Sequence, residues 1–381
     1  SPGAVSLDAG AVAGADGSAS RSGRFVPVLL PVQKRAKFQP DQYRGTFSPY
    51  RGQIHAHTTY SDGATGIPQD AYDMARSNGL DFFAVSDHLE FFPFQPWKWQ
   101  ATKDQANSRT IDGTFVVLWG YEWGTGIANP LGPTLYNHVN VLSDNMVDVL
   151  SSTNLDGFYA NVAKLGDDPI VKFNHPDSLG AGPHVAGITV SYDNWDGFRY
   201  NAAMDRFVRF VRVMPGFSGS IENGYKPLLE NGWHMAPGFG EDNHQPTWGQ
   251  SERRMGVFAA SLTREGIKEA MRARRTFTSQ DRDAWVRVTA EDPAGELWMG
   301  STVVGPGAVK MKISGGDPSD GLKTLDVVSV GGAVVYTQDL GSVRAFEAEF
   351  LADPGQDAYY YVRLTEDDGD LVFSAPIYID R

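Results

Sequence analysis

The segment GQIHAHTTYSDG, residues 52–63, begins as an apolar strand pattern and ends in a run of polar side chains. His55 and His57 are separated by one residue, so alternation along a strand places both imidazoles on the same face. Two imidazoles on one face can hold one metal ion. A carboxylate, Asp62, follows five residues after His57. The segment therefore predicts a strand that ends in a metal site.

The chain around this segment alternates between short hydrophobic runs and helical patterns, from about residue 47 to residue 283. Residues 67–79, IPQDAYDMARSNG, carry apolar side chains on one helical face and end at a glycine. Residues 263–275, TREGIKEAMRARR, predict a second helix, and LDFFAVSDH (80–88) and PIVKFNHP (169–176) predict strands. Alternation of this length favours an α/β fold, either a parallel barrel or a doubly wound sheet.

The pattern changes after residue 283. Residues 284–381 consist of short alternating runs separated by Gly, Pro and Asp, which is typical of a small antiparallel β-sandwich. Residues 1–22 are small, polar and unpatterned, and we expect a disordered or linker tail. The predicted organisation is therefore a tail (1–22), a catalytic α/β domain (23–283) and a C-terminal β-sandwich (284–381). The tail also leads us to expect a bacterial protein exported to the periplasm or the extracellular space.

Composition excludes several classes of function. The 381 residues contain 33 Lys and Arg against 46 Asp and Glu, a formal charge of −13, which argues against a broad nucleic-acid surface. Cysteine is absent, so thiolate nucleophiles and sulfur metal ligands are excluded. No apolar run is long enough for a membrane span. The sequence leaves the oligomeric state open.

Most of the histidines, with several carboxylates, fall at the ends of successive predicted strands. These candidate metal ligands are His55, His57, Asp62, His88, Glu122, His138, His175, Asp242 and His244. A set of imidazoles and carboxylates without sulfur suits Zn, Mn or Fe. Nine ligands exceed what one tetrahedral ion needs, so the pattern predicts a cluster of two or three divalent ions.

The motif blocks HAHTTYSDG, SDH, NHV, NHP and DNH, with Glu122 ending a strand, resemble the PHP family, named for its polymerase and histidinol phosphatase members. The resemblance covers about residues 48–280 and implies a distorted (β/α)7 barrel. The stretch GYEWG (120–124), the block NHVNV and the trailing β-domain look most like the exported branch that includes carbaryl hydrolase.

The resemblance also implies how the ligands are divided. The first metal would be held by His55, His57, Glu122 and Asp242; Glu122 would bridge to a second metal on His138 and His175; a third would lie on Asp62, His88 and His244. Some family members have a histidine where this chain has Asp62, and a carboxylate there is a compatible ligand. Asp87, in Ser86-Asp87-His88, is expected to orient its neighbours rather than bind metal.

A metal cluster of this kind activates water for hydrolysis without a serine or cysteine nucleophile. The divalent ions would outweigh the carboxylates in charge, which favours a small anionic substrate such as a phosphate ester. A metal-dependent phosphoesterase is therefore the first hypothesis. A hydrolase of carbamate, ester or amide bonds is the second, and a non-catalytic metal-bearing binding protein is the third.

Other residues are candidates for contact with the substrate. His88 and His184 could protonate the leaving group, because each follows a predicted strand near the motifs. Lys172, Arg253 and Arg254 could clamp a phosphate. Five tryptophans near the motifs could form an aromatic wall for an apolar leaving group, or could pack in the core: Trp97, Trp99, Trp123, Trp195 and Trp248.

Overall fold

The computed structural model describes residues 42–125, 135–176, 184–185, 188–189, 192–214, 221–305 and 307–381. The predicted tail, residues 1–22, lies outside this part of the chain. All of the described residues belong to one compact unit. Within the described ranges, no helix is both long and apolar enough to cross a bilayer.

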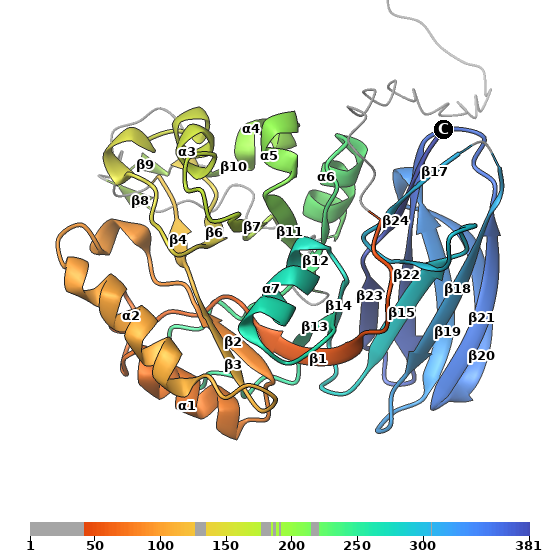
Figure 1. Ribbon diagram of the computed structural model, residues 1–381, viewed down its shortest axis with the longest axis horizontal. Coiled ribbons are helices and arrows are strands. Elements are labelled where there is room, and N and C mark those ends of the chain that lie inside the picture. Colours follow the sequence, from red (N-terminus) through yellow and green to blue (C-terminus); the bar gives the residue numbers. More distant parts are fainter. Residues whose placement is uncertain are drawn as a thin grey trace, which may run out of the picture. The chain divides into compact units, whose positions relative to one another are not determined.

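The fold is mixed α/β, as predicted, with several sheets and few helices (Figure 1). The largest sheet has eleven strands, and five of its strands carry the predicted catalytic region: β1 (Ser48–Gln53), β2 (Phe82–Val85), β3 (Val116–Trp119), β13 (Arg254–Ala259) and β14 (Thr276–Ser279). Strands β1, β2 and β3 are parallel, whereas β13 pairs antiparallel with both β1 and β14. Strand β2 is buried along its whole length, which explains its continuous apolar run of Phe82–Val85.

A second sheet of five strands has the order β12–β11–β7–β6–β4. Its strands are β4 (Tyr121–Trp123), β6 (Val139–Leu142), β7 (Ile170–Phe173), β11 (Val208–Arg212) and β12 (Ala236–Gly238). Strand β11 runs parallel to β7 and β12, but β6 is antiparallel to both β4 and β7. These antiparallel pairs interrupt the alternation, so the closed (β/α)7 barrel stays a prediction.

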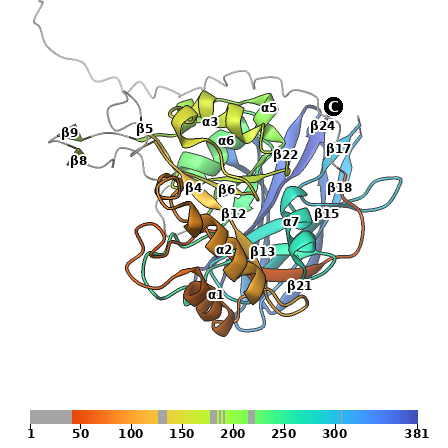
Figure 2. The same ribbon diagram turned by 60° about the vertical axis from the view of Figure 1, so that its left-hand side comes forward.

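The two helices predicted from periodicity are confirmed as α1 (Pro68–Ser77) and α7 (Arg264–Arg272). Helix α1 starts with a proline and buries Ala71, Tyr72 and Ala75, while Thr263 caps α7 by accepting a hydrogen bond from Gly266 N. Helix α2 (Pro96–Arg109) was not predicted, because its apolar residues form no clear stripe. In both ribbon views α1 and α2 lie together (Figures 1 and 2).

The other helices are short: α3 (Leu155–Val162), α4 (Trp195–Phe198), α5 (Ala202–Asp205) and α6 (Lys226–Glu230). Figures 1 and 2 agree in placing α3, α5 and α6 together on one side of the five-stranded sheet. The remaining turns and strands of this region are η1 (Leu89–Phe91), β5 (Leu135–Tyr136), η2 (Val149–Ser151), β8 (His184–Val185), β9 (Ile188–Thr189), β10 (Tyr192–Asp193) and the π-helical η3 (Ile221–Tyr225).

The described part of residues 285–380 consists of strands and one 3-10 turn, η4 (Val330–Gly332). Its strands are β15 (Trp285–Ala290), β16 (Leu297–Trp298), β17 (Thr302–Val304), β18 (Val309–Gly316), β19 (Leu322–Ser329), β20 (Ala333–Val343), β21 (Ala345–Ala352), β22 (Ala358–Glu366), β23 (Leu371–Ser374) and β24 (Ile377–Asp380). Strands β16, β15, β18 and β21 form a separate sheet, but β23 pairs with β14 and so joins the eleven-stranded sheet. The β-sandwich and the domain boundary at residue 283 therefore stay predictions.

Candidate metal centre

The segment that follows β1 places the first two histidines between two neighbouring chain segments. On one side, Ser86 N donates to Ala56 O at 2.9 Å. On the other side, His57 N donates to Asn243 O at 3.0 Å and Asp242 N donates to His55 O at 3.1 Å. These bonds bring the H-A-H, S-D-H and D-N-H blocks together at one edge of the sheets.

His138 reaches the same edge although it precedes its strand. Strand β6 is antiparallel to both neighbours, and its first residue, Val139, lies opposite Trp123 and Phe173. The residue before an antiparallel strand lies at the edge where the neighbouring strands end. Asn174 N donates to His138 O at 3.0 Å, which holds the N-H-V and N-H-P blocks side by side.

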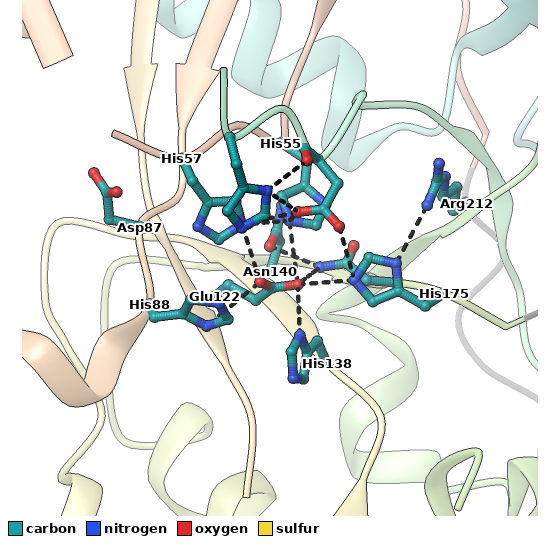
Figure 3. A network of polar contacts seen from close by, with 12 residues as sticks. His55, His57, Asp87, His88, Glu122, His138, Asn140, His175 and Arg212 are labelled. Atoms are coloured by element: carbon teal, nitrogen blue, oxygen red, sulfur yellow. Dashed lines mark hydrogen bonds and ion pairs between the residues drawn. The ribbon is translucent and has the colours of Figure 1, made fainter. Parts of the chain in front are cut away.

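Glu122 is the centre of the arrangement and is fully buried. Its Oε1 lies 3.1 Å from His55 Nε2, 3.3 Å from His138 Nδ1 and 3.3 Å from His175 Nε2. Its Oε2 lies 3.2 Å from His57 Nε2 and 3.6 Å from His88 Nδ1. Figure 3 shows these five imidazoles pointing toward the one carboxylate.

Two further carboxylates complete the set. Asp242 Oδ1 lies 3.2 Å from His55 Nε2 and 3.0 Å from His57 Nε2. Asp62, which is partly exposed, lies within 3.5 Å of three imidazoles: His57, His88 and His244. The structure thus brings together all nine predicted ligands, which we call the histidine cluster: His55, His57, Asp62, His88, Glu122, His138, His175, Asp242 and His244.

The spacing of these atoms fits metal ligation. Zn–N and Zn–O bonds of about 2.1 Å in a tetrahedron separate neighbouring ligand atoms by about 3.4 Å. The donors form three sets, and within each set the ligand atoms all lie within 4.8 Å of one another. The sets are His55, His57, Glu122 and Asp242; His57, Asp62, His88 and His244; and His88, Glu122 and His138. Several buried atoms among them have no hydrogen-bond partner, including Glu122 Oε2, Asp242 Oδ1 and His88 Nδ1. The donors therefore suit divalent ions.

The grouping differs in part from the one that the resemblance implies. The group expected to hold the first metal is unchanged. The group expected to hold the third metal, Asp62, His88 and His244, also includes His57. His138, expected to share a metal with His175, groups with His88 and Glu122 instead. Arg212, which the sequence analysis missed, lies with Nη1 3.2 Å from His175 Nδ1 (Figure 3). This contact uses the outer nitrogen of His175 and leaves Nε2 directed at Glu122 and Asp242.

Electrostatics couple the carboxylates to the imidazoles. Burial raises the pKa of the Glu122 carboxyl group, but the surrounding histidines, His55 and His138 foremost, hold it well below its usual value. Burial lowers the pKa of His57, yet Asp242 and Glu122 together raise it well above the usual range. Burial lowers the pKa of His175 to about 4. Without metal the cluster thus holds protons on some imidazoles, and metal binding must displace them.

The backbone is strained at two of the predicted ligands. His175 has φ 50° and Asp242 has φ 59°, a left-handed conformation that non-glycine residues rarely adopt. Two glycines leave room for ligands: a Cβ at Gly240 would lie 2.3 Å from His55 Cβ, and one at Gly124 would lie 2.6 Å from His138 Cδ2. The glycines in G-F-G-E-D-N-H and Y-E-W-G therefore allow close approach of the backbone to the imidazoles.

Asp87 is buried and points away from the cluster (Figure 3). Its Oδ1 accepts hydrogen bonds from Thr58 N at 2.7 Å and Ser61 Oγ at 2.6 Å, and its Oδ2 accepts one from Thr58 Oγ1 at 2.8 Å. Ser61 Oγ in turn lies 3.3 Å from His57 Nδ1. This geometry agrees with the expectation that Asp87 orients the loop that carries His57 and Asp62.

Two asparagines that sequence reasoning missed hold Glu122 in place: Asn174 binds its carboxylate, and Asn140 binds Asn174. Asn174 Nδ2 donates to Glu122 Oε1 at 2.7 Å and to Asn140 Oδ1 at 2.8 Å. Asn140 Nδ2 donates to Ile54 O at 2.9 Å. Both asparagines belong to the quoted N-H-V-N-V and N-H-P blocks, so their proximity to histidines was the available signal.

The predicted phosphate clamps lie in different surroundings. Lys172 is buried and donates to Asn174 Oδ1, and burial followed by the charge of Arg212 lowers its pKa to about 7. Arg254 is buried, and its guanidinium donates to the carbonyl groups of Ser251 and Arg253. Lys172 therefore connects to Glu122 through Asn174, and the guanidinium of Arg254 is bound to backbone carbonyl groups. The roles of Lys172, Arg253 and Arg254 in substrate binding stay predictions.

Of the remaining candidates, His184 begins β8, but its side chain lies outside the described part of the chain. The aromatic wall is largely core packing: four of the five tryptophans are buried, namely Trp99, Trp123, Trp195 and Trp248. Trp123 stacks on Phe158 at 4.2 Å, and Trp248 Nε1 donates to His57 O at 3.1 Å. Trp97, on α2, is 59% exposed.

No family model and no curated protein matches the chain. A two-domain protein from Bacteroides vulgatus that contains a predicted PHP-like metal-dependent phosphoesterase is 16% identical, with a TM-score of 0.44 over 92% of this chain and 99% of that one. A protein from Bifidobacterium adolescentis predicted to be a metal-dependent phosphoesterase is 13% identical, with a TM-score of 0.32 over 58% and 95%. An amidohydrolase from Chromobacterium violaceum is 20% identical, with a TM-score of 0.19 over 40% and 45%. At these TM-scores the assignment of the site rests on its side chains.

Proposed function

We propose that this chain is a metal-dependent phosphoesterase that hydrolyses a small organic phosphate ester. The observation that carries the proposal is the position of Glu122. One buried carboxylate directs Oε1 at His55, His138 and His175 and Oε2 at His57 and His88. A carboxylate shared in this way is suited to bridging two metal ions held by the imidazoles on either side.

The donors of the histidine cluster fit two or three divalent ions, of which Zn, Mn and Fe suit imidazole with carboxylate. Two such ions, when bound, supply a nucleophile by acidifying water and polarise the phosphoryl group. The protein's own task is then to hold the imidazoles in place. Asn174 fixes the Glu122 carboxylate, and Asp87 fixes the loop of His57 through Thr58 and Ser61.

The charges around the cluster favour an anionic substrate. Arg212 is buried next to His175, and Lys172 lies beneath Glu122 through Asn174. With a pKa of about 7, Lys172 contributes only part of a positive charge near neutral pH. Arg212, and Lys172 in its protonated form, offset part of the negative charge of Glu122 and Asp242. This lowers the electrostatic cost of bringing a phosphate group to the centre. A neutral substrate would gain nothing from these two residues.

His88 is the described imidazole best placed to hold a proton for the leaving group. Its side chain is 12% exposed, so it reaches the boundary between the buried cluster and solvent. Its Nε2 lies 3.5 Å from Asp62 Oδ2, and its Nδ1 lies 3.8 Å from Glu90 Oε1. This position at the boundary with solvent is where a general acid would meet a departing oxygen.

We further infer that the chain is a PHP-family hydrolase of the exported branch that includes carbaryl hydrolase. The inference rests on the order of the motif blocks and on the meeting of the nine predicted ligands, of which His175 joins through its contacts with Glu122 and Asp242. It carries with it a closed (β/α)7 barrel over residues 23–283, a β-sandwich over 284–381 and export from the cytoplasm.

A panel of substrates tests the proposal. Purified protein is assayed with added Mn²⁺ or Zn²⁺ on p-nitrophenyl phosphate, on its bis-ester and on a naphthyl carbamate, beside Glu122→Gln. The proposal expects phosphoester turnover that Glu122→Gln lowers by about 10²–10³-fold. Turnover of the carbamate alone would make the chain a carbamate or ester hydrolase. Metal binding without turnover of any substrate would make it a binding protein.

A further inference from the structure

A second group of acidic residues lies outside the histidine cluster, where three strands end. Asp281 follows β14, Asp317 follows β18, and Glu366 is the last residue of β22. One carboxylate oxygen from each of the three lies within 4.8 Å of the others. We call this group the carboxylate cluster. Glu366 also groups in the same way with Asp368 and Asp370, in the turn before β23.

The geometry leaves the carboxylates of this cluster unsatisfied. Glu366 and Asp317 are fully buried. Neither oxygen of Glu366 has a hydrogen-bond partner, and Asp317 Oδ2 has none. Asp317 Oδ1, in contrast, accepts hydrogen bonds from Ser319 N at 2.6 Å and Asp320 N at 2.9 Å. Buried carboxylates without partners are costly, so something must neutralise the oxygens that face one another.

We infer that Asp281, Asp317 and Glu366 form a structural site for a hard divalent cation, Ca²⁺, separate from the histidine cluster. The donors are all carboxylate oxygens, with no imidazole among them, which suits Ca²⁺ or Mg²⁺ and not Zn²⁺. Ca²⁺ accepts six to eight oxygens in flexible geometry, whereas Mg²⁺ demands a near-ideal octahedron. Asp368 and Asp370 in the adjoining turn offer the additional oxygens that Ca²⁺ favours.

A cation at this position would stabilise the junction between the two halves of the chain. Residues 280 and 371 already connect through Gln280 N to Leu371 O at 3.2 Å and Leu371 N to Gln280 Oε1 at 3.0 Å. Glu366 N donates to Asp370 O at 2.9 Å. The cation would add a link from the turn after β14 to the ends of β18 and β22. It would act on stability and not on the hydrolytic reaction.

The alternative occupant is a proton. Glu366 faces the carboxyl group of Asp317, and the two can share a hydrogen bond only when one is protonated. Glu366→Gln separates the two cases, because an amide can replace a protonated carboxyl group but lacks the negative charge that makes a carboxylate a stronger ligand for Ca²⁺. Asp281→Asn is a second variant at a more exposed position, in case Glu366→Gln fails to fold. Glu347→Gln, an exposed carboxylate on β21, is the matched control.

The experiment titrates Ca²⁺ into the full chain loaded with its transition metal, in calcium-free buffer, by calorimetry and thermal unfolding. We expect one Ca²⁺ to bind with Kd of about 10⁻⁵–10⁻³ M. A concentration 100-fold above Kd should raise Tm by about 3–5 °C. Glu347→Gln and His57→Ala should keep this binding, whereas Glu366→Gln or Asp281→Asn should weaken it at least tenfold.

Three results would overturn the inference. The first is no Ca²⁺ binding by the wild type up to about 10 mM, which is above the weakest calcium sites of proteins. The second is equal binding by wild type, Glu366→Gln and Asp281→Asn. The third is loss of Ca²⁺ binding in His57→Ala, which would assign the ion to the histidine cluster. If Ca²⁺ does not change Tm of the wild type and Glu366→Gln has a higher Tm than the wild type, the site holds a shared proton and not a cation.

Discussion

The histidine cluster and the carboxylate cluster are both buried groups of ligand atoms, but they differ in chemistry and in support. In the histidine cluster, Asn174 donates to Glu122 and Arg212 contacts His175. Each carboxylate there also lies against several imidazoles. In the carboxylate cluster, Glu366 has no hydrogen-bond partner for either oxygen. The first cluster can be neutralised by its own protons, whereas the second depends on an added cation or a shared proton.

The comparison shows that the type of donor, and not burial, decides which kind of ion a site selects. Imidazole with carboxylate favours transition metals such as Zn, Mn or Fe, whereas carboxylate alone favours hard ions such as Ca²⁺ or Mg²⁺. The sequence signals differ in the same way. The histidine cluster is built from compact motifs such as His55-Ala56-His57, whereas the carboxylate cluster joins Asp281 to Glu366, which belong to distant strands.

The largest expected effect follows removal of the shared carboxylate. Glu122→Gln should lower kcat/KM on p-nitrophenyl phosphate by about 10²–10³-fold, because an amide cannot support two groups of imidazoles at once. The loss should exceed that of His138→Ala by about tenfold. Kinetics and metal content are measured together. Glu347→Gln, which changes an exposed carboxylate on β21, is the matched control and should stay close to wild type.

Equal losses in Glu122→Gln and His138→Ala would contradict a bridging role for Glu122. Such a result would leave Asp242, which lies within 3.5 Å of His55, His57 and His175, as the other shared carboxylate.

The next effect distinguishes an anionic from a neutral substrate. Asp62→Ala and His88→Ala remove support from the outer group of ligands. Each should lower phosphomonoester hydrolysis by about 10²–10³-fold, since charge stabilisation in the transition state contributes about that much. Hydrolysis of an aryl carbamate should decline less, provided that metal content is unchanged. If the carbamate rate falls and the phosphoester rate does not, the phosphoesterase assignment is wrong.

A smaller effect concerns the glycine that makes room for His55. Gly240→Ala would place a methyl group 2.3 Å from His55 Cβ and 2.4 Å from His55 N. Overpacking of this kind costs about 1–3 kcal/mol of unfolding free energy. Denaturant unfolding and metal content should both decline. Gly307→Ala is the matched control, because a Cβ there faces open space. Equal stability of the two variants would show that the segment after β1 can move away from residue 240.

The last effect is the pH dependence of the calcium-free protein. Burial, followed by Asp317, raises the pKa of Glu366 from its usual 4.5 to about 9. When a carboxyl pKa is higher in the native than in the unfolded protein, the native state keeps its full stability at pH values below the pKa of the unfolded state. This stability is lost as pH rises from about 4.5 through about 9. Tm of the wild type without Ca²⁺ should therefore fall across this window.

Ca²⁺ should counter this fall at the upper end of the window, where the cation takes the place of the proton on Glu366 and the proton is released to solvent. Glu366→Gln should show a flatter profile of Tm against pH, because the amide does not titrate. A wild-type profile that matches Glu366→Gln, with and without Ca²⁺, would mean that Glu366 is ionised and solvated in solution.

Local patterns determined much of this protein in advance. Periodicity predicted α1 and α7, and the polar ends of apolar runs predicted all nine members of the histidine cluster, because side-chain alternation and strand ends are properties of a few neighbouring residues. The mixed α/β class followed from the order of those runs. Helix α2 was missed because its burial depends on packing and not on a stripe in its sequence.

Only the tertiary structure decided which ligands meet. The antiparallel position of β6 brings His138 to Glu122 and His88, and the pairing of β14 with β23 brings residue 281 to the turn that contains Asp368 and Asp370. Arg212 meets His175 for the same reason, since β11 lies beside β7. Strand pairing joins segments far apart in the chain, and its register is set by the packing of whole sheets. No local pattern contains that information.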